Sequence, residues 1–230
     1  MKEKIRNLLI WIYSIPINYK IFPREVAKKL PLRVNYNVRC IGLRKGCIEI
    51  HSDSVYKGMI QIGLPQEVSS HDDKSPSCLY FETENGRMIF NGRADFYESI
   101  AIRIYEDGIL EIGDGFMSNT NASINVSKGV TIGKNAQWGW NVEIIDTDGH
   151  DILDSDMKKC NPDNKIVIGD DVWLGAKSSL LKGAVIPNNS VVGYGSIVSK
   201  QFDEANVIIV GSPGKIVKHN ISWRREKTKQ

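Results

Sequence analysis

Several features that would narrow the class of protein are missing from this sequence of 230 residues. Its four cysteines form no CxxC pair and have no clustered histidines beside them, which argues against a disulfide framework and a zinc site. The 30 basic and 27 acidic residues nearly cancel, so the net charge gives no reason to expect nucleic acid as a partner. We therefore expect a globular protein of a reducing compartment, the cytoplasm.

A long hydrophobic run is also missing. The most apolar stretch, LLIWIYSIPI at residues 8–17, is too short to span a bilayer, and it contains Pro16. No small-residue cleavage site follows it, so it does not resemble a secretory signal peptide. We expect a short helix packed against the body of the protein, with a helix lying on a membrane surface as the weaker alternative.

What the sequence does contain is a period of six. An aliphatic position recurs without a slip, and a second position four residues later holds mostly small side chains. These positions are Ile168, Leu174, Leu180, Ile186, Val192 and Val198, followed by Val172, Ser178, Ala184, Ser190, Ser196 and Phe202. An amphipathic helix would need a spacing of about 3.6 residues, so the pattern excludes one. The upstream block 126–144 has the same spacing.

This period predicts an all-β solenoid of short parallel strands, in which three sides of about six residues close one coil. Asparagine and glycine between the hexads, such as Asn189 and Gly195, suit the left-handed backbone of tight corners. We expect the coils to run over 86–203, with an excursion at 146–165. Residues 1–85 are expected to hold a short helix and strands, forming either extra coils or a cap, and 204–230 a C-terminal extension with a basic tail.

The excursion begins with DTDGHDILDSD, residues 146–156, which places His150 among five aspartates. A calcium loop would carry glutamate at its twelfth position, where Met157 stands. A zinc-dependent carbonic anhydrase would need three histidine ligands, and the four histidines are scattered along the chain. We therefore expect no metal.

Four runs of sequence carry a resemblance to a known family. They are GDGFMSNTNASI at 113–124, GWNVEIIDTDGHDI at 139–152, IGDDVWLGAKSSLLKGAVIPNNSVVGYGSIVSK at 168–200, and VGSPGKIVK at 210–218. In this order they resemble the hexapeptide-repeat acyltransferases, and within them the maltose, galactoside and polysaccharide O-acetyltransferases. The resemblance implies a left-handed parallel β-helix, a homotrimer with active sites between subunits, acetyl-CoA as donor and a saccharide as acceptor.

The resemblance also implies roles for individual residues. His150 matches the catalytic histidine, and Asn119 an asparagine that holds the acceptor. The positions matching the acetyl-CoA tract are Trp173, Ala176, Gly193, Tyr194, Ser199, Lys200 and Lys215. Tyr194 departs from the family, which often has alanine there, and its ring is expected to narrow or redirect the tract.

The chemistry of acyl transfer needs such residues. An alcohol must lose its proton as it attacks a thioester, and a neutral imidazole can accept that proton, so His150 is the candidate base. Asp146 and Asp148 are the candidates to orient its ring, and the Ala176 amide is the candidate oxyanion donor. We expect O-acetylation of a saccharide in surface-polysaccharide assembly. N-acetylation of an amino sugar, acetylation of a foreign compound, and a non-catalytic scaffold are the alternatives.

Overall fold

The computed structural model describes residues 2–65 and 76–224, so His71 and most of the polar loop around it lie outside the described residues. The described part holds two helices, α1 (Lys2–Ile21) and α2 (Arg24–Ala27), and strands that form three sheets of nine, seven and six members.

Sheet A contains β1 (Leu32–Val34), β4 (Ile60–Leu64), β7 (Ala94–Tyr97), β10 (Phe116–Ser118), β13 (Gln137–Trp138), β16 (Trp173–Leu174), β19 (Val191–Val192), β21 (Ile208–Val210) and β22 (Lys215–Lys218). Sheet B contains β2 (Arg39–Ile41), β5 (Cys78–Phe81), β8 (Ala101–Ile104), β11 (Ser123–Val126), β14 (Glu143–Ile145), β17 (Ser179–Leu181) and β20 (Ile197–Val198). Sheet C contains β3 (Ile48–Ile50), β6 (Arg87–Phe90), β9 (Ile109–Ile112), β12 (Val130–Ile132), β15 (Ile166–Ile168) and β18 (Val185–Ile186).

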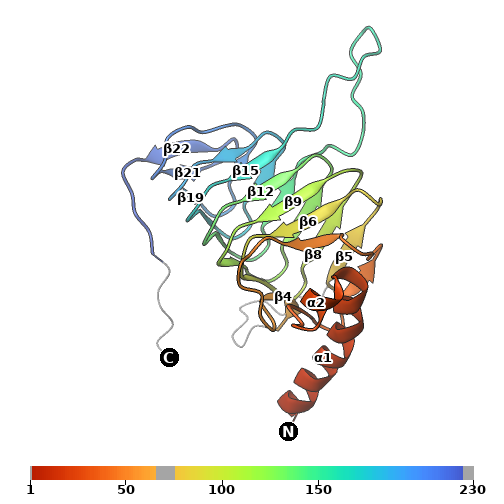
Figure 1. Ribbon diagram of the computed structural model, residues 1–230. Helices are drawn as coiled ribbons and strands as arrows, with labels where there is room; N and C mark the ends of the chain where they lie inside the picture. Colours follow the sequence, from red (N-terminus) through yellow and green to blue (C-terminus); the bar gives the residue numbers. More distant parts are fainter. Residues whose placement is uncertain (1, 66–75, 225–230) are drawn as a thin grey trace.

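The chain visits the three sheets in turn, so each coil adds one parallel strand to every side (Figure 1). Leu174 pairs with Val192 one coil later, which gives 18 residues to a coil and confirms the prediction of three six-residue sides. The last strand differs, because β22 runs antiparallel to β21 and ends the stack of coils.

The hexad positions make the core. All six aliphatic residues from Ile168 to Val198 are at most 1% exposed, and the small residues between them are buried as well. Earlier coils hold larger side chains, in a ladder from Phe96 through Phe116 to Trp138 with ring centroids 4.9–5.0 Å apart. Stacking of equivalent side chains along the coil axis therefore supplies most of the apolar burial.

The corners between sheets A and B have a left-handed backbone at the same place in successive coils. The residues are Ser99, Asn121, Asn141, Lys177 and Gly195, with φ between 58° and 67°. The last four donate their amides to carbonyls of the preceding coil, as Asn141 does to Thr120 at 3.1 Å. The left-handed conformation predicted for Asn189 and Gly195 is confirmed.

Coils begin at β1, well before residue 86, so the strands from Leu32 to Phe81 belong to extra coils of the same three sheets and not to a separate capping sheet. The strands of these first coils are not six residues apart, so a search for a six-residue period does not detect them. Val34 pairs with Ile62, which is 28 positions later, and Phe96 pairs with Ser118 after 22. Longer corners between the short strands break the period of six.

Helix α1 covers the open end of the first coil, as predicted for the apolar N-terminal stretch. The Asn18 side chain accepts from the Leu32 amide at 3.0 Å and donates to the Leu32 carbonyl at 2.7 Å. Ser14 accepts from the Val34 amide at 2.9 Å. The exposed edge of β1 therefore finds hydrogen-bond partners on the helix, which removes an edge that another strand could pair with. Neither helix of the described ranges is long and apolar enough to cross a membrane.

Candidate functional site

The excursion leaves the coil between β14 and β15 and projects far from the body (Figure 1). Its first residue, Asp146, is fully buried. The carboxylate accepts three backbone N–H groups, from Ser127 at 2.7 Å, Lys128 at 2.8 Å and Gly129 at 2.5 Å. Burial raises the pKa of Asp146, and the three amide hydrogen bonds oppose that shift. Asp146 thus fastens the start of the excursion to the corner that follows β11.

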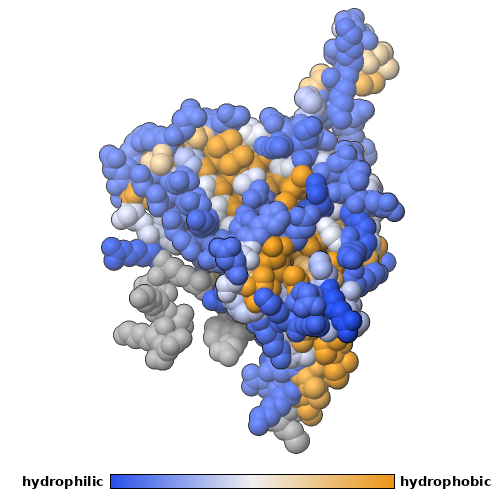
Figure 2. Space-filling view, in the orientation of Figure 1, coloured by the Kyte–Doolittle hydropathy of each residue, from blue (hydrophilic) through white to orange (hydrophobic). Residues whose placement is uncertain are grey.

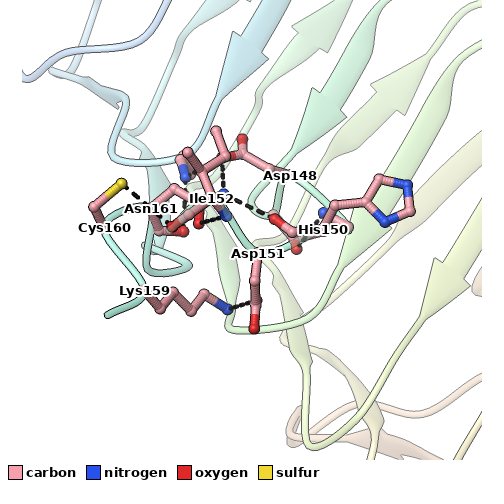
Figure 3. A network of polar contacts seen from close by, with 10 residues as sticks. Asp148, His150, Asp151, Ile152, Lys159, Cys160 and Asn161 are labelled. Atoms are coloured by element: carbon pink, nitrogen blue, oxygen red, sulfur yellow. Dashed lines mark hydrogen bonds and ion pairs between the residues drawn. The ribbon is translucent and has the colours of Figure 1, made fainter. Parts of the chain in front are cut away.

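Asn161 organises the segment around His150. Its side-chain amide donates to the His150 carbonyl at 2.8 Å and to Asp148 at 2.7 Å, and its oxygen accepts from the Ile152 amide at 2.7 Å (Figure 3). Lys182 donates to Asp148, and this hydrogen bond lowers the pKa of that carboxyl. One buried asparagine therefore holds the His150 carbonyl, the Ile152 amide and the side chain of Asp148.

The imidazole of His150 points away from this network (Figure 3). Within the described residues its ring makes no hydrogen bond, and neither Asp146 nor Asp148 contacts it. The ring is exposed at a groove of about 600 Å³, here called the His150 groove, whose wall includes Tyr105 and Asn125. The general base candidate is thus accessible from solvent, and its orienting partner is not supplied by the two aspartates in this arrangement.

A second groove, here called the Trp173 groove, gathers most of the other predicted residues. It has a volume of about 500 Å³ and lies on sheet A and the corner that leads to sheet B. Among its lining residues are Asn119, Trp173, Ala176, Gly193 and Tyr194. No residue lines both grooves among those described, so one chain keeps His150 apart from Asn119 and Trp173.

Ala176 has the free amide that an oxyanion donor requires. Among the described residues its N–H donates to no protein acceptor, although the residue is only 7% exposed. Gly139 leaves space in front of this amide, because a Cβ at that position would stand only 2.5 Å from the Ala176 nitrogen. A substrate oxygen entering the Trp173 groove could accept this hydrogen bond.

Trp223, in the C-terminal tail, is a site residue that sequence reasoning missed. It packs against Trp173 with ring centroids 6.0 Å apart, and its indole donates to the Asp171 carbonyl at 2.7 Å. Gln137 lines the Trp173 groove and is 6% exposed, and its buried side-chain oxygen has no hydrogen-bond partner among the residues that the structure describes. The signal in the sequence that could have indicated it is a tryptophan within the basic tail.

Three predicted tract residues lie elsewhere. Ser199, Lys200 and Lys215 are exposed on the last coils and line neither groove. The Lys200 ammonium stands 5.0 Å from the Phe202 ring centroid. Among the described residues, no cluster of three histidine, cysteine or acidic side chains is placed to hold a metal ion.

Comparisons with known proteins find clear relatives. The chain is 32% identical over 135 residues to a protein of Escherichia coli K12 named provisionally as a lipopolysaccharide biosynthesis O-acetyl transferase, WbbJ, covering 54% of this chain and 68% of that protein. It is 29% identical over 155 residues to an uncharacterized 24.8 kDa protein in the cps region of Klebsiella pneumoniae, covering 67% and 68%. It is 34% identical over 106 residues to the galactoside O-acetyltransferase of Lactococcus lactis, covering 45% and 50%.

The chain therefore spans about two thirds of the first two relatives and half of the third. Among solved structures, a galactoside acetyltransferase in complex with coenzyme A matches 55% of this chain and 59% of its own, at 29% identity and a TM-score of 0.42. No family model matches the chain.

The coil and these relatives define the class as an acyltransferase built on a left-handed parallel β-helix. The chain belongs to the hexapeptide-repeat acyltransferases, among their O-acetyltransferases, which confirms the resemblance found in its motifs.

Proposed function

We propose that this protein transfers an acetyl group from acetyl-CoA to a hydroxyl of a saccharide during surface-polysaccharide assembly, with His150 as general base. The observation that carries the proposal is the excursion itself. Asp146 and Asn161 fix its backbone by buried hydrogen bonds, yet the His150 imidazole is exposed and has no hydrogen-bond partner in the described part of the chain. A histidine that stabilised the fold would be buried and hydrogen-bonded, whereas the His150 ring is free to contact a substrate.

We place the donor in the Trp173 groove. Trp173 and Tyr194 offer exposed aromatic walls, and the unpaired Ala176 amide lies between them on the chain. The thioester oxygen would accept from that amide as negative charge develops. Lys200 and Lys215 are the candidates to meet the phosphates at the far end of the cofactor. Asn119 lines the same groove and would hold the acceptor hydroxyl.

The reaction then needs two copies of the chain. One chain keeps its two grooves separate, so the His150 of one subunit would reach the Trp173 groove of the next, in a homotrimer. The tip of the excursion supports this, because Ile152, Leu153 and Met157 are 44–73% exposed and would be covered by a neighbour.

In the assembled site, His150 takes the proton of the acceptor hydroxyl as its oxygen attacks the thioester carbon. The carbon–sulfur bond breaks, and the protonated imidazole gives its proton to the departing thiolate. Direct attack needs no covalent enzyme intermediate. Asp148, held by Lys182 and Asn161 two residues before His150, remains the candidate to orient the ring once a second subunit closes the site.

The test is complementation between inactive chains. His150→Ala and Asn119→Ala variants are each expected to lose most acetyl transfer to a saccharide, while Asp156→Asn, a change at an exposed aspartate of the same excursion, is expected to retain it. Mixed oligomers of the two inactive chains should recover activity, because some sites combine an intact His150 with an intact Asn119. Full activity in His150→Ala would remove the base assignment, and mixed oligomers without recovery would place each site within one chain.

Two alternative functions, N-acetylation and a non-catalytic scaffold, can be tested by analysis of the product and by acetyl-CoA binding. An acetyl group lost in mild base marks an ester, and a stable one marks N-acetylation. Calorimetric titration with acetyl-CoA distinguishes an enzyme from a scaffold, because a scaffold would not bind it.

A further inference from the structure

Helix α1 has two opposite apolar faces, and only one of them is used by the fold. The inner face packs on the first coil through Ile10, Ile17 and Ile21. The outer face carries six large apolar side chains that are 41–60% exposed, here called the α1 stripe: Ile5, Leu8, Leu9, Ile12, Ile15 and Tyr19. The helix projects past the end of the coil, and its apolar surface is visible in Figure 2. An exposed apolar patch of this kind marks an interaction surface.

The charged residues beside the α1 stripe indicate which kind of partner it can bind. At about 100° per residue, the six side chains lie within roughly 60° of Ile12 around the helix axis. Lys4 and Lys20 lie roughly 80° to either side of Ile12, so a basic residue borders each edge of the stripe. Arg6 lies beyond the Lys20 edge, and Glu3, the one acidic residue in α1, faces the opposite direction. A hydrophobic stripe between rows of cations is the pattern of helices that lie in the headgroup region of a bilayer.

A second copy of the chain fits the stripe less well. In either orientation, two stripes that met face to face would place Lys4 and Lys20 at the edges of the contact. Glu3, the one carboxylate of α1, faces away from the stripe, so a second α1 would not neutralise these charges. Anionic lipid headgroups supply the opposite charge along both edges and an apolar layer beneath.

We propose that the α1 stripe docks this protein on an anionic lipid surface. The helix lies in the plane of the headgroups, with Leu8 and Ile12 turned into the acyl boundary and Lys4 and Lys20 at the phosphates. The excursion leaves the coil between β14 and β15, several coils away from α1 (Figure 1), so lipid docking and acetyl transfer depend on different residues.

The test is co-sedimentation of the full chain with vesicles. Vesicles of phosphatidylcholine with phosphatidylglycerol are expected to bind the protein, and vesicles of phosphatidylcholine alone to bind it at least about tenfold more weakly, with binding reduced by added salt. Leu8→Glu/Ile12→Glu should lower binding at least about tenfold, because the charges would enter the apolar layer. Lys4→Gln/Lys20→Gln should lower it only for the anionic vesicles. Val217→Glu, at an equally exposed apolar residue of β22, is the matched control and should bind like the unaltered chain.

Three outcomes would overturn the proposal. They are an absence of binding to anionic vesicles, binding that Leu8→Glu/Ile12→Glu leaves unchanged, and dissociation of the oligomer by those substitutions in light scattering, which would make a second copy the occupant. Circular dichroism checks that the variants are folded. Acetyl transfer to a soluble acceptor should be the same in the stripe variants and in the unaltered chain, so failure of lipid docking and failure of the proposed function give different results.

Discussion

Removing the carboxylate of Asp146 should release the excursion at 146–165 from the coil. The side chain is fully buried and is the acceptor for three consecutive amides, those of Ser127, Lys128 and Gly129, at 2.5–2.8 Å. In Asp146→Ala those three donors lose their partner away from water. An unpaired buried donor costs roughly 1–3 kcal/mol, so the local cost is about 3–5 kcal/mol, allowing for partial relaxation.

Asp146→Asn should be milder, at about 1–2 kcal/mol. It keeps one oxygen for the Lys128 and Gly129 amides, and its NH₂ group faces the Ser127 amide. It also removes a negative charge that burial disfavours, as the raised pKa of Asp146 indicates. The loss of local stability should therefore be larger for Asp146→Ala than for Asp146→Asn. It should be near zero for Asp156→Asn, the control at an exposed position.

The assay is hydrogen exchange by mass spectrometry, because a solenoid opens locally and a single unfolding transition would average over its coils. Amides 127–129 and peptides covering 146–165 should exchange faster in Asp146→Ala, while peptides of the last coils stay protected. Acetyl transfer should fall with little change in acetyl-CoA affinity, because Asp146 lies outside the Trp173 groove. Unchanged exchange at 127–129 would refute the anchoring role.

Three further predictions concern the Trp173 groove, the excursion and the cysteines. Trp223→Ala should weaken acetyl-CoA or acceptor binding severalfold in calorimetry, because it removes the ring that packs on Trp173, and unchanged binding would make the tail irrelevant to the groove. Asn161→Ala should lower kcat more than it raises KM, because it frees the His150 carbonyl and the Ile152 amide and so the backbone that carries the proposed base; equal effects on both constants would count against this positioning role. In native alkylation followed by peptide mapping, the exposed Cys160 should react well before Cys40, whose thiol pKa burial raises to about 11; equal rates would contradict that burial.

The contrast between Leu174 and Leu32 shows why part of the coil was predictable. Leu174 belongs to a run in which every side of the coil has six residues, so the period in the sequence is the period of the structure. Leu32 begins an earlier coil in which the corners are longer, and its partner Ile60 lies 28 positions away with no repeat between them. Longer corners do not change the strands, but they remove the six-residue period by which a single sequence indicates this fold.

The aspartates near His150 show that prediction from the sequence has the same limit at the candidate site. The sequence placed Asp146 and Asp148 as equivalent candidates beside the base. Folding buries Asp146 under a corner of the previous coil and leaves Asp148 paired with Lys182, which is 34 positions away. Which carboxylate meets which donor depends on how the coils stack, and the local spacing does not contain that information.

By itself, the sequence determined the three-sided coil of the second half, its left-handed corners, the excursion at 146–165 and the family, because each of these is encoded by residues close together in the chain. Only the tertiary structure decided that the first coils begin at β1, that Asp146 anchors the excursion, that Trp223 returns to Trp173, and that His150 and Asn119 lie in separate grooves. Those features arise from contacts between residues 17 to 52 positions apart, such as the hydrogen bond from Trp223 to Asp171. Such contacts are fixed by the rise and turn of the stacked coils, which no short pattern of residues records.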